Sequence, residues 1–174
     1  MRRSKRLRYK WIGRLGLGET GSALVETALT MPILIMLLGG AVEFGDYAFK
    51  STQVANAARA AAQYAAMNGG GYADCNNSIN GGTCSATSGV TRAAKNDAPW
   101  VASKCSAFTV TIATSCVCSD ATACSTTTFA CTTGKPKITV TAQTQAQCSA
   151  VASVPGLSLN SLTFHGYSQQ MVLP

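Results

Sequence analysis

Two groups of residues in this sequence have types and spacings that could do chemistry. One is a set of eight cysteines, all of which follow the long apolar run in the first quarter of the chain. An even number of cysteines confined to an exported segment is typical of disulfides formed in an oxidising compartment, and eight allow roughly a hundred pairings. Metal binding is the alternative, with Cys116-Val-Cys118 as its best fragment, but the sequence has no Cys-x-x-Cys and only one histidine. We therefore predict disulfides, with no metal site and no cofactor. The candidates are Cys75, Cys84, Cys105, Cys116, Cys118, Cys124, Cys131 and Cys148.

The second group is Gly21, Ser22 and a lone carboxylate, Glu26. An ionised carboxylate within a membrane segment costs a few kcal/mol, so such residues usually have a function. The simpler interpretation is that Glu26 lies roughly 7 Å past Gly21 along a helix, near solvated headgroups. The functional interpretation is that cleavage after Gly21 creates an amine on Ser22, which Glu26 of a neighbouring subunit neutralises. The carboxylate must come from a neighbouring subunit, because the amine and Glu26 of one chain are too poorly placed along the same helix to contact each other.

The element that carries this glutamate has the length of a bilayer. Residues 22–42 hold no charge besides Glu26, and as a helix they span roughly 31 Å, against about 30 Å for a hydrocarbon core. Residues 1–21 carry seven Lys or Arg and one acid, which predicts a cytoplasmic N-terminus and an exported remainder. The remainder is nearly neutral, with seven basic and six acidic residues, so nucleic-acid binding is not predicted.

The apolar run passes directly into an amphipathic, alanine-rich pattern, which predicts one helix over residues 22–67. We expect Pro32 to bend this helix without ending it, and Gly39 and Gly40 to add flexibility or permit close helix packing. The Asn-Gly-Gly-Gly run at 68–71 should terminate it. The predicted apolar face of its second half comprises Val54, Ala58, Ala61, Ala62 and Ala65. The predicted polar face comprises Glu43, Asp46, Lys50, Gln53, Asn56, Arg59 and Gln63.

Residues 68–174 are rich in Ser, Thr, Gly and Cys. Alternation and β-branched content predict strands at 108–113, 137–144 and 162–167, and the last of these could continue to 172. Residues 75–91 and 114–134 are expected to be loops. The predicted class is α+β: a basic leader (1–21), a long helix (22–67) with a transmembrane part at about 22–42, and a small disulfide-braced antiparallel β domain (68–174).

An enzymatic function is not predicted. His165 is the only histidine and falls in a predicted strand, as an exposed or packed residue. The carboxylates beyond the long helix, Asp74, Asp97 and Asp120, fall in predicted loops and form no close pair in sequence. The sequence contains no nucleophile elbow and no phosphate-binding glycine loop.

Glycine followed by Ser22 and then Glu26 resembles the processing site of type IV pilin-like proteins. The run from Gly21 to Ala66 is similar to the TadE-like minor pilins, or pseudopilins, of tight-adherence (Flp) pilus systems, through Glu26, Pro32, Glu43 and the Asn-Ala-Ala-Arg run at 56–59. The segments 138–142 and 154–174 add a weaker similarity. Thr27 replaces the family's frequent aromatic residue, and the cysteine-rich insert at about 72–134 is not a general family feature.

This resemblance implies that a prepilin peptidase cuts between Gly21 and Ser22, and that Glu26 serves recognition or assembly. It also implies partners in the pilus assembly platform, other pilin subunits and the inner membrane. The chain is then a single-pass inner-membrane protein with a periplasmic C-terminal domain, which can reach the cell surface or pilus on assembly. Two alternatives stay open: an uncleaved anchor of the same apparatus, and a secreted cysteine-rich binder released by signal peptidase near Ala41.

Overall fold

The computed structural model describes residues 20–68, 75, 82–122, 124, 130–149 and 161–172. The chain divides into two compact units, residues 1–42 and residues 43–174. The first contributes the beginning of a long helix. The second, called the head below, contains the rest of that helix and all the described strands.

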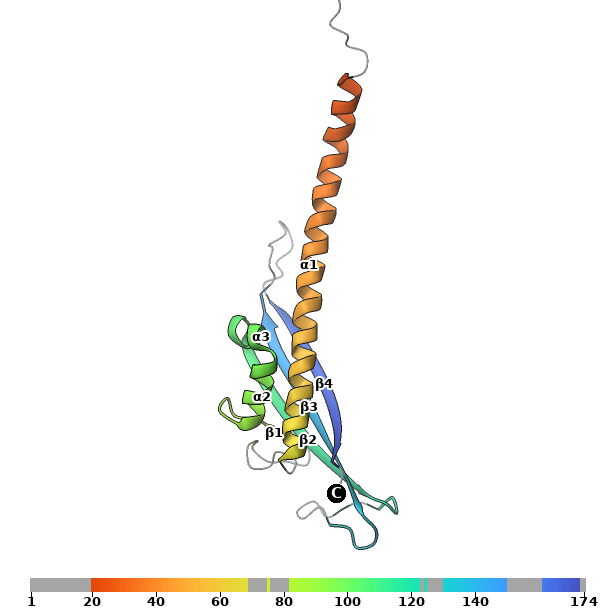
Figure 1. Cartoon of the computed structure of the whole chain (residues 1–174), viewed down its shortest axis with the longest axis vertical. Helices are drawn as coiled ribbons and strands as arrows, with labels where there is room; N and C mark the ends of the chain where they lie inside the picture. Colours follow the sequence, from red (N-terminus) through yellow and green to blue (C-terminus); the bar gives the residue numbers. More distant parts are fainter. Residues whose placement is uncertain are drawn as a thin grey trace, which may run out of the picture. The chain divides into compact units, whose positions relative to one another are not determined.

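Helix α1 runs from Thr20 to Met67 and continues through Pro32 (Figure 1). The long helix predicted from the sequence is therefore confirmed, and Pro32 does not end it. The helix ends at the predicted residue, where both the backbone N–H and the side-chain amide of Asn68 donate to the Tyr64 carbonyl. The glycines at 69–71 lie outside the described residues.

Four antiparallel strands form one sheet in the order β1-β2-β3-β4: β1 (Gly82–Thr83), β2 (Ser106–Cys118), β3 (Pro136–Cys148) and β4 (Leu162–Val172). The three predicted strands are confirmed, and each is longer than the predicted core. The loop predicted at 114–134 is wrong over its first five residues, which continue β2. They do so because the register with β3 persists to the pair Cys118–Pro136, with Thr114 and Cys118 buried.

Two short helices, α2 (Gly89–Asp97) and α3 (Pro99–Lys104), precede β2. The loop predicted at 75–91 is therefore wrong where it meets β1 and the start of α2, and Asp97 ends a helix instead of lying in a loop. Local capping explains α2: Ser88 is its N-cap and accepts a hydrogen bond from the Thr91 N–H at 3.0 Å. Pro99 occupies the first turn of α3, where a missing N–H costs nothing.

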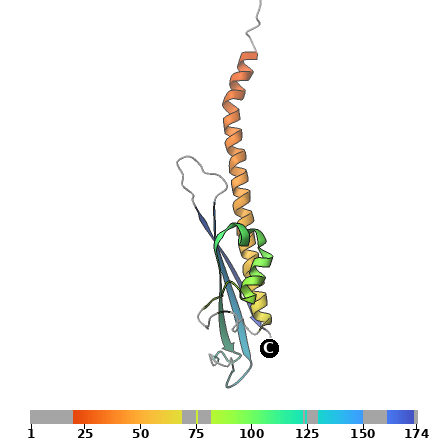
Figure 2. The same ribbon diagram turned by 90° about the vertical axis from the view of Figure 1, so that its left-hand side faces the viewer.

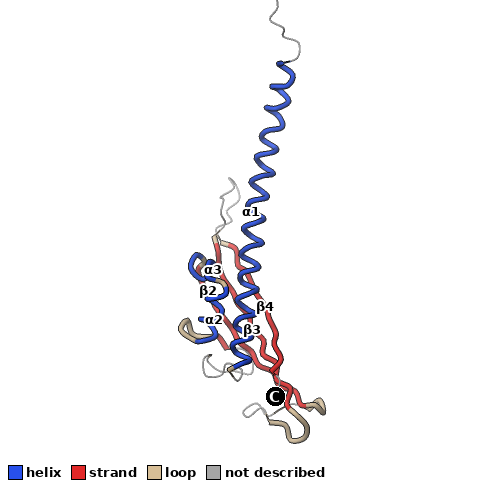
Figure 3. The backbone as a smooth tube through the Cα atoms, in the orientation of Figure 1, coloured by secondary structure: helices blue, strands red, loops and turns tan. Residues whose placement is uncertain are grey.

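The head has two layers. Residues 43–67 of α1, with α2 and α3, cover one face of the sheet, and none of the described helices covers the other face (Figures 2 and 3). The core between the layers is built largely from small side chains, including the predicted apolar face of the helix and Ala57. Helix and sheet approach closely: the Thr144 hydroxyl donates to the Val54 carbonyl at 2.8 Å, and a Cβ on Gly166 would collide with that oxygen.

Candidate processing segment and the disulfide-braced head

Gly21, Ser22 and Glu26 all lie in α1, and all three are exposed. The hydroxyl groups of two nearby threonines form hydrogen bonds within the helix. The Thr27 hydroxyl donates to the Ala23 carbonyl at 2.8 Å, and the Thr30 hydroxyl donates to the Glu26 backbone carbonyl at 3.0 Å. In the part of the chain that the structure describes, the Glu26 carboxylate has no hydrogen bond and no ion pair. The geometry thus leaves this carboxylate available to another molecule.

Every residue from 21 to 42 is exposed. The stretch includes eleven large apolar side chains, so it presents an apolar surface all round the helix, which is typical of a membrane segment. By length and composition it belongs to a helix able to cross a bilayer. A Cβ added to Gly39 or Gly40 would meet no heavy atom of the described residues within 4 Å. Their expected role in packing stays a prediction.

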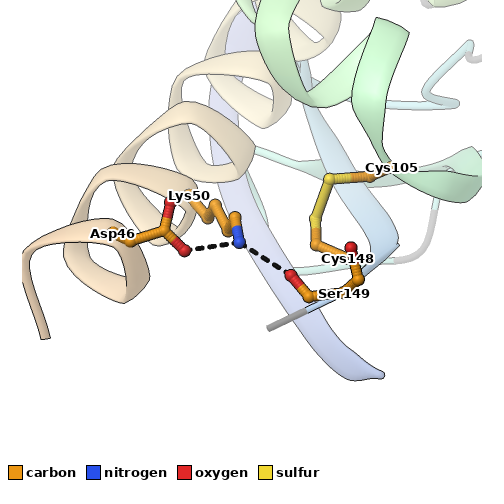
Figure 4. Close-up of polar contacts among 5 residues, drawn as sticks. All are labelled: Asp46, Lys50, Cys105, Cys148 and Ser149. Carbon is orange, nitrogen blue, oxygen red and sulfur yellow. Dashed lines mark hydrogen bonds and ion pairs between the residues drawn. A yellow bond between two sulfur atoms is a disulfide. The ribbon is translucent and has the colours of Figure 1, made fainter. Parts of the chain in front are cut away.

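An ion pair with a buried lysine and a partly exposed aspartate lies near the start of the head (Figure 4). The Lys50 ammonium contacts the Asp46 carboxylate at 2.5 Å and donates to the Ser149 carbonyl at 2.9 Å. It also lies 5.3 Å from the centre of the Trp100 ring, within the range of a cation–π interaction. Asp46 and Lys50 are four residues apart on α1 in the acid-first order that favours such a pair. The placement of Lys50 on a polar face was wrong, because only 3% of its side chain is exposed. Its partners on α3 and after β3 compensate for the lost water.

The eight cysteines form four disulfides: Cys75–Cys84, Cys105–Cys148, Cys116–Cys124 and Cys118–Cys131. The predicted framework is confirmed, and the structure selects one pairing. Cys105–Cys148 closes the longest loop, 43 residues, and joins the end of α3 to the end of β3 beside Ser149 (Figure 4). The sulfurs of Cys118, Cys124 and Cys131 lie within 4.8 Å of one another because the disulfides Cys116–Cys124 and Cys118–Cys131 are neighbours. A metal ion binds a cysteine as its thiolate, and a sulfur in a disulfide is not a thiolate.

Asp120 organises the turn after β2. Its Oδ1 accepts hydrogen bonds from the Thr122 hydroxyl at 2.6 Å and the Thr122 N–H at 3.1 Å, and its Oδ2 accepts one from the Thr133 hydroxyl at 2.6 Å. These donors favour the charged form and lower the pKa of Asp120 to about 2, with the Thr122 hydroxyl contributing most. The carboxylate therefore stabilises the turn, which lies within the loops closed by Cys116–Cys124 and Cys118–Cys131.

The remaining residues considered for catalysis are dispersed. His165 lies in β4 and is exposed, Asp97 ends α2, and Asp74 lies outside the described residues. Sequence reasoning missed Trp100, whose ring packs edge-on against Phe49 at 5.8 Å between centroids. A usable signal was present, because a large aromatic residue directly after a helix-starting proline is well placed to anchor a short helix to a core.

Comparison with known families finds that residues 21–63 match the model described as "TadE-like protein". No match was found among curated proteins or among solved structures. The match begins at Gly21 and includes Glu26, Pro32 and Glu43, the residues that carried the resemblance, which is thus confirmed. It lies wholly within α1, and it indicates a component associated with a tight-adherence pilus. The sheet and its disulfides lie outside it.

Proposed function

We propose, from the TadE-like character of residues 21–63, that this chain is a minor pilin-like (pseudopilin) subunit of a tight-adherence pilus and secretion system. The observation that carries the proposal is the family match over a helix in which residues 21–42 are exposed and uncharged except for Glu26. The chain acts as a structural subunit: it is anchored by this segment, and its disulfide-braced head extends into the periplasm.

In this proposal a prepilin peptidase hydrolyses the bond between Gly21 and Ser22. Water adds across the amide, the leader departs with the Gly21 carboxylate, and Ser22 keeps the new amine. That amine is positive in a region of low dielectric, where a nearby carboxylate stabilises it strongly. The Glu26 carboxylate has no partner in the described part of its own chain, which is what pairing with the amine of the next subunit requires.

The proposal also assigns partners. Besides the peptidase, the chain engages the pilus assembly platform, other pilin subunits and the inner membrane, with its N-terminus cytoplasmic. The exposed surface of residues 21–42 supports lateral packing of helices, and Gly39 and Gly40 allow a neighbouring backbone to come close. The four disulfides support export, because such bonds persist in oxidising compartments.

The mature N-terminus tests this function directly. Intact-mass and N-terminal analysis of the exported protein, in cells with and without the candidate peptidase, should show a first residue of Ser22 only when the peptidase is present. Retention of Met1 in both strains would favour an uncleaved anchor of the same apparatus. A start at Val42 would favour a secreted binder, and either result contradicts the proposal.

The assembly role of Glu26 has its own experiment. Glu26→Ala should leave export of the protein intact and reduce its recovery with sheared pili by tenfold or more. Thr27→Ala is the matched control, since it alters the adjacent exposed residue but removes only a hydroxyl bonded within the helix. Equal incorporation of both variants would count against a docking role for the carboxylate.

A further inference from the structure

The face of the sheet that none of the described helices covers carries an unusual set of side chains. Alternate residues of β2, β3 and β4 point to this face, and most of them are threonine or glutamine. The strand register aligns them across the sheet, so neighbouring side chains in a row lie roughly 5 Å apart at Cβ. Two adjacent rows are Thr109–Gln145–His165 and Thr111–Gln143–Tyr167.

A depression of about 290 Å³ lies over these two rows. Its volume is close to the lower end of the range for small-molecule sites, about 300 Å³. The six side chains of the two rows make no hydrogen bond to the rest of the described chain, so their hydroxyl, amide and imidazole groups are available to a ligand. The Thr144 hydroxyl, which also borders the depression, is already committed to the Val54 carbonyl.

The chemistry of the lining restricts the ligand. Among the described residues, no Asp, Glu, Lys or Arg borders the depression, so an ionic ligand would find no opposite charge there. A purely apolar ligand would strip water from amides and hydroxyls without replacing the lost hydrogen bonds. The suitable ligand carries several uncharged hydroxyl groups and one flat apolar patch, because Tyr167 is 61% exposed and borders the depression with the two glutamines.

We propose that this depression binds a neutral oligosaccharide. The amides of Gln143 and Gln145 and the hydroxyls of Thr109 and Thr111 exchange hydrogen bonds with sugar hydroxyls, and Tyr167 packs against the C–H face of one sugar ring. This site is independent of the processing of the N-terminal segment, since it is built entirely from the sheet of the head.

The experiment uses the full chain with its disulfides intact, in lipid nanodiscs instead of sugar-based detergent. The protein is applied to an array of defined neutral and anionic oligosaccharides, and the best neutral binder is titrated by calorimetry. Tyr167→Ala and Gln143→Ala should each weaken its binding by tenfold or more. Gln169→Ala is the matched control: it lies on β4, is exposed on the same face, and does not border the depression, so the affinity of this variant should stay within twofold.

Three results would overturn the proposal. The first is no binding to any neutral oligosaccharide at millimolar concentration by protein whose circular dichroism matches the folded state. The second is binding only to anionic sugars. The third is concentration-dependent dimerisation that Tyr167→Ala abolishes while sugar has no effect, which would make this face a contact between two copies of the chain. Preserved near-ultraviolet circular dichroism in the variants excludes misfolding as the cause of lost binding.

Discussion

Residues 21–42 and 43–67 belong to one continuous helix, yet their side chains have opposite surroundings. In the first stretch, large apolar residues are exposed on every side. In the second, small residues such as Val54 and Ala61 are fully buried against the sheet, and Arg59 and Gln63 are exposed. Both stretches are α-helical, so the difference lies in the surroundings that each surface suits. The surface of the first stretch suits lipid or other helices, and that of the second suits a protein core.

The difference implies separate sources of stability. The first stretch needs a bilayer or neighbouring helices to cover its apolar surface. The head depends on contacts between segments distant in sequence: the Cys105–Cys148 disulfide, the hydrogen bond from Lys50 to the Ser149 carbonyl and the close approach at Gly166. Changes in one region should therefore leave the other unaffected, and the following experiments test that separation in order of decreasing effect.

The largest expected effect comes from removing Cys105–Cys148 by the double substitution Cys105→Ser and Cys148→Ser. Opening a 43-residue loop should lower the unfolding free energy of the head by about 4 kcal/mol in the loop-entropy description. Chemical denaturation of the full chain in nanodiscs, followed by near-ultraviolet circular dichroism, measures it. Membrane retention should not change, and a loss of retention would show that the two regions depend on each other.

The converse change is Leu34→Arg in the first stretch. A charge at the centre of a membrane helix costs about 3 kcal/mol, so the equilibrium constant for insertion should fall roughly a hundredfold. Carbonate extraction of membranes measures the integrated fraction. Gln63→Arg, on the exposed side of the second stretch, is the control and should have no effect. Full integration of Leu34→Arg would mean that this surface does not meet lipid.

Asp46→Asn tests the buried ion pair. Lys50 would keep its bond to the Ser149 carbonyl but lose its countercharge, and we expect the head to lose about 2 kcal/mol. This is less than the cost of breaking a fully buried pair, about 3–5 kcal/mol, because Asp46 is 21% exposed. Arg59→Ala, which removes an exposed cation on the same helix, should change the unfolding free energy by under about 0.5 kcal/mol. Equal effects of the two substitutions would contradict the assignment.

Gly166→Ala tests the close contact between helix and sheet. The added methyl would meet the Val54 carbonyl and the Thr144 hydroxyl, and both are fixed by their mutual hydrogen bond. Overpacking of this kind costs about 1–3 kcal/mol. Gly45→Ala is the control, since nothing lies within 4 Å of its Cβ position, and it should be neutral or slightly stabilising. A neutral Gly166→Ala would show that the helix can move away from β4 freely.

The smallest effect concerns pH. The pKa of Asp120 is lowered from 3.8 to about 2, so the stability that it contributes is fully present above about pH 4 and is lost as the pH falls towards 2. Carbon-13 NMR of the carboxyl group should report this midpoint, and Thr122→Val should raise it. Since Asp120 is exposed, the change should stay within its turn. An unshifted midpoint in Thr122→Val would show that the hydroxyl is not the main cause.

The arrangement of the candidate processing residues along α1 could be predicted because it is local. Gly21, Glu26 and Pro32 lie within one helix, and their spacing along the chain fixes their spacing in space. The short helices α2 and α3 were missed because nine and six residues carry little periodic signal, although Ser88 and Pro99 are local signals for where they begin. The extension of β2 past Ala113 was missed for a related reason: it is specified by pairing with β3, a separate segment of the chain, and not by its own residues.

The sequence by itself determined a long helix with an apolar first half, a C-terminal part with disulfides and the TadE-like character of residues 21–63. Each of these features depends only on composition or on the spacing of residues close together in the chain. Only the tertiary structure decided which cysteines pair, that Lys50 is buried beside Trp100, and that two rows of threonine, glutamine and aromatic side chains border one depression. These features arise from strand register and from the packing of a helix on a sheet. Both bring together residues whose separation along the chain says nothing about their distance in the fold.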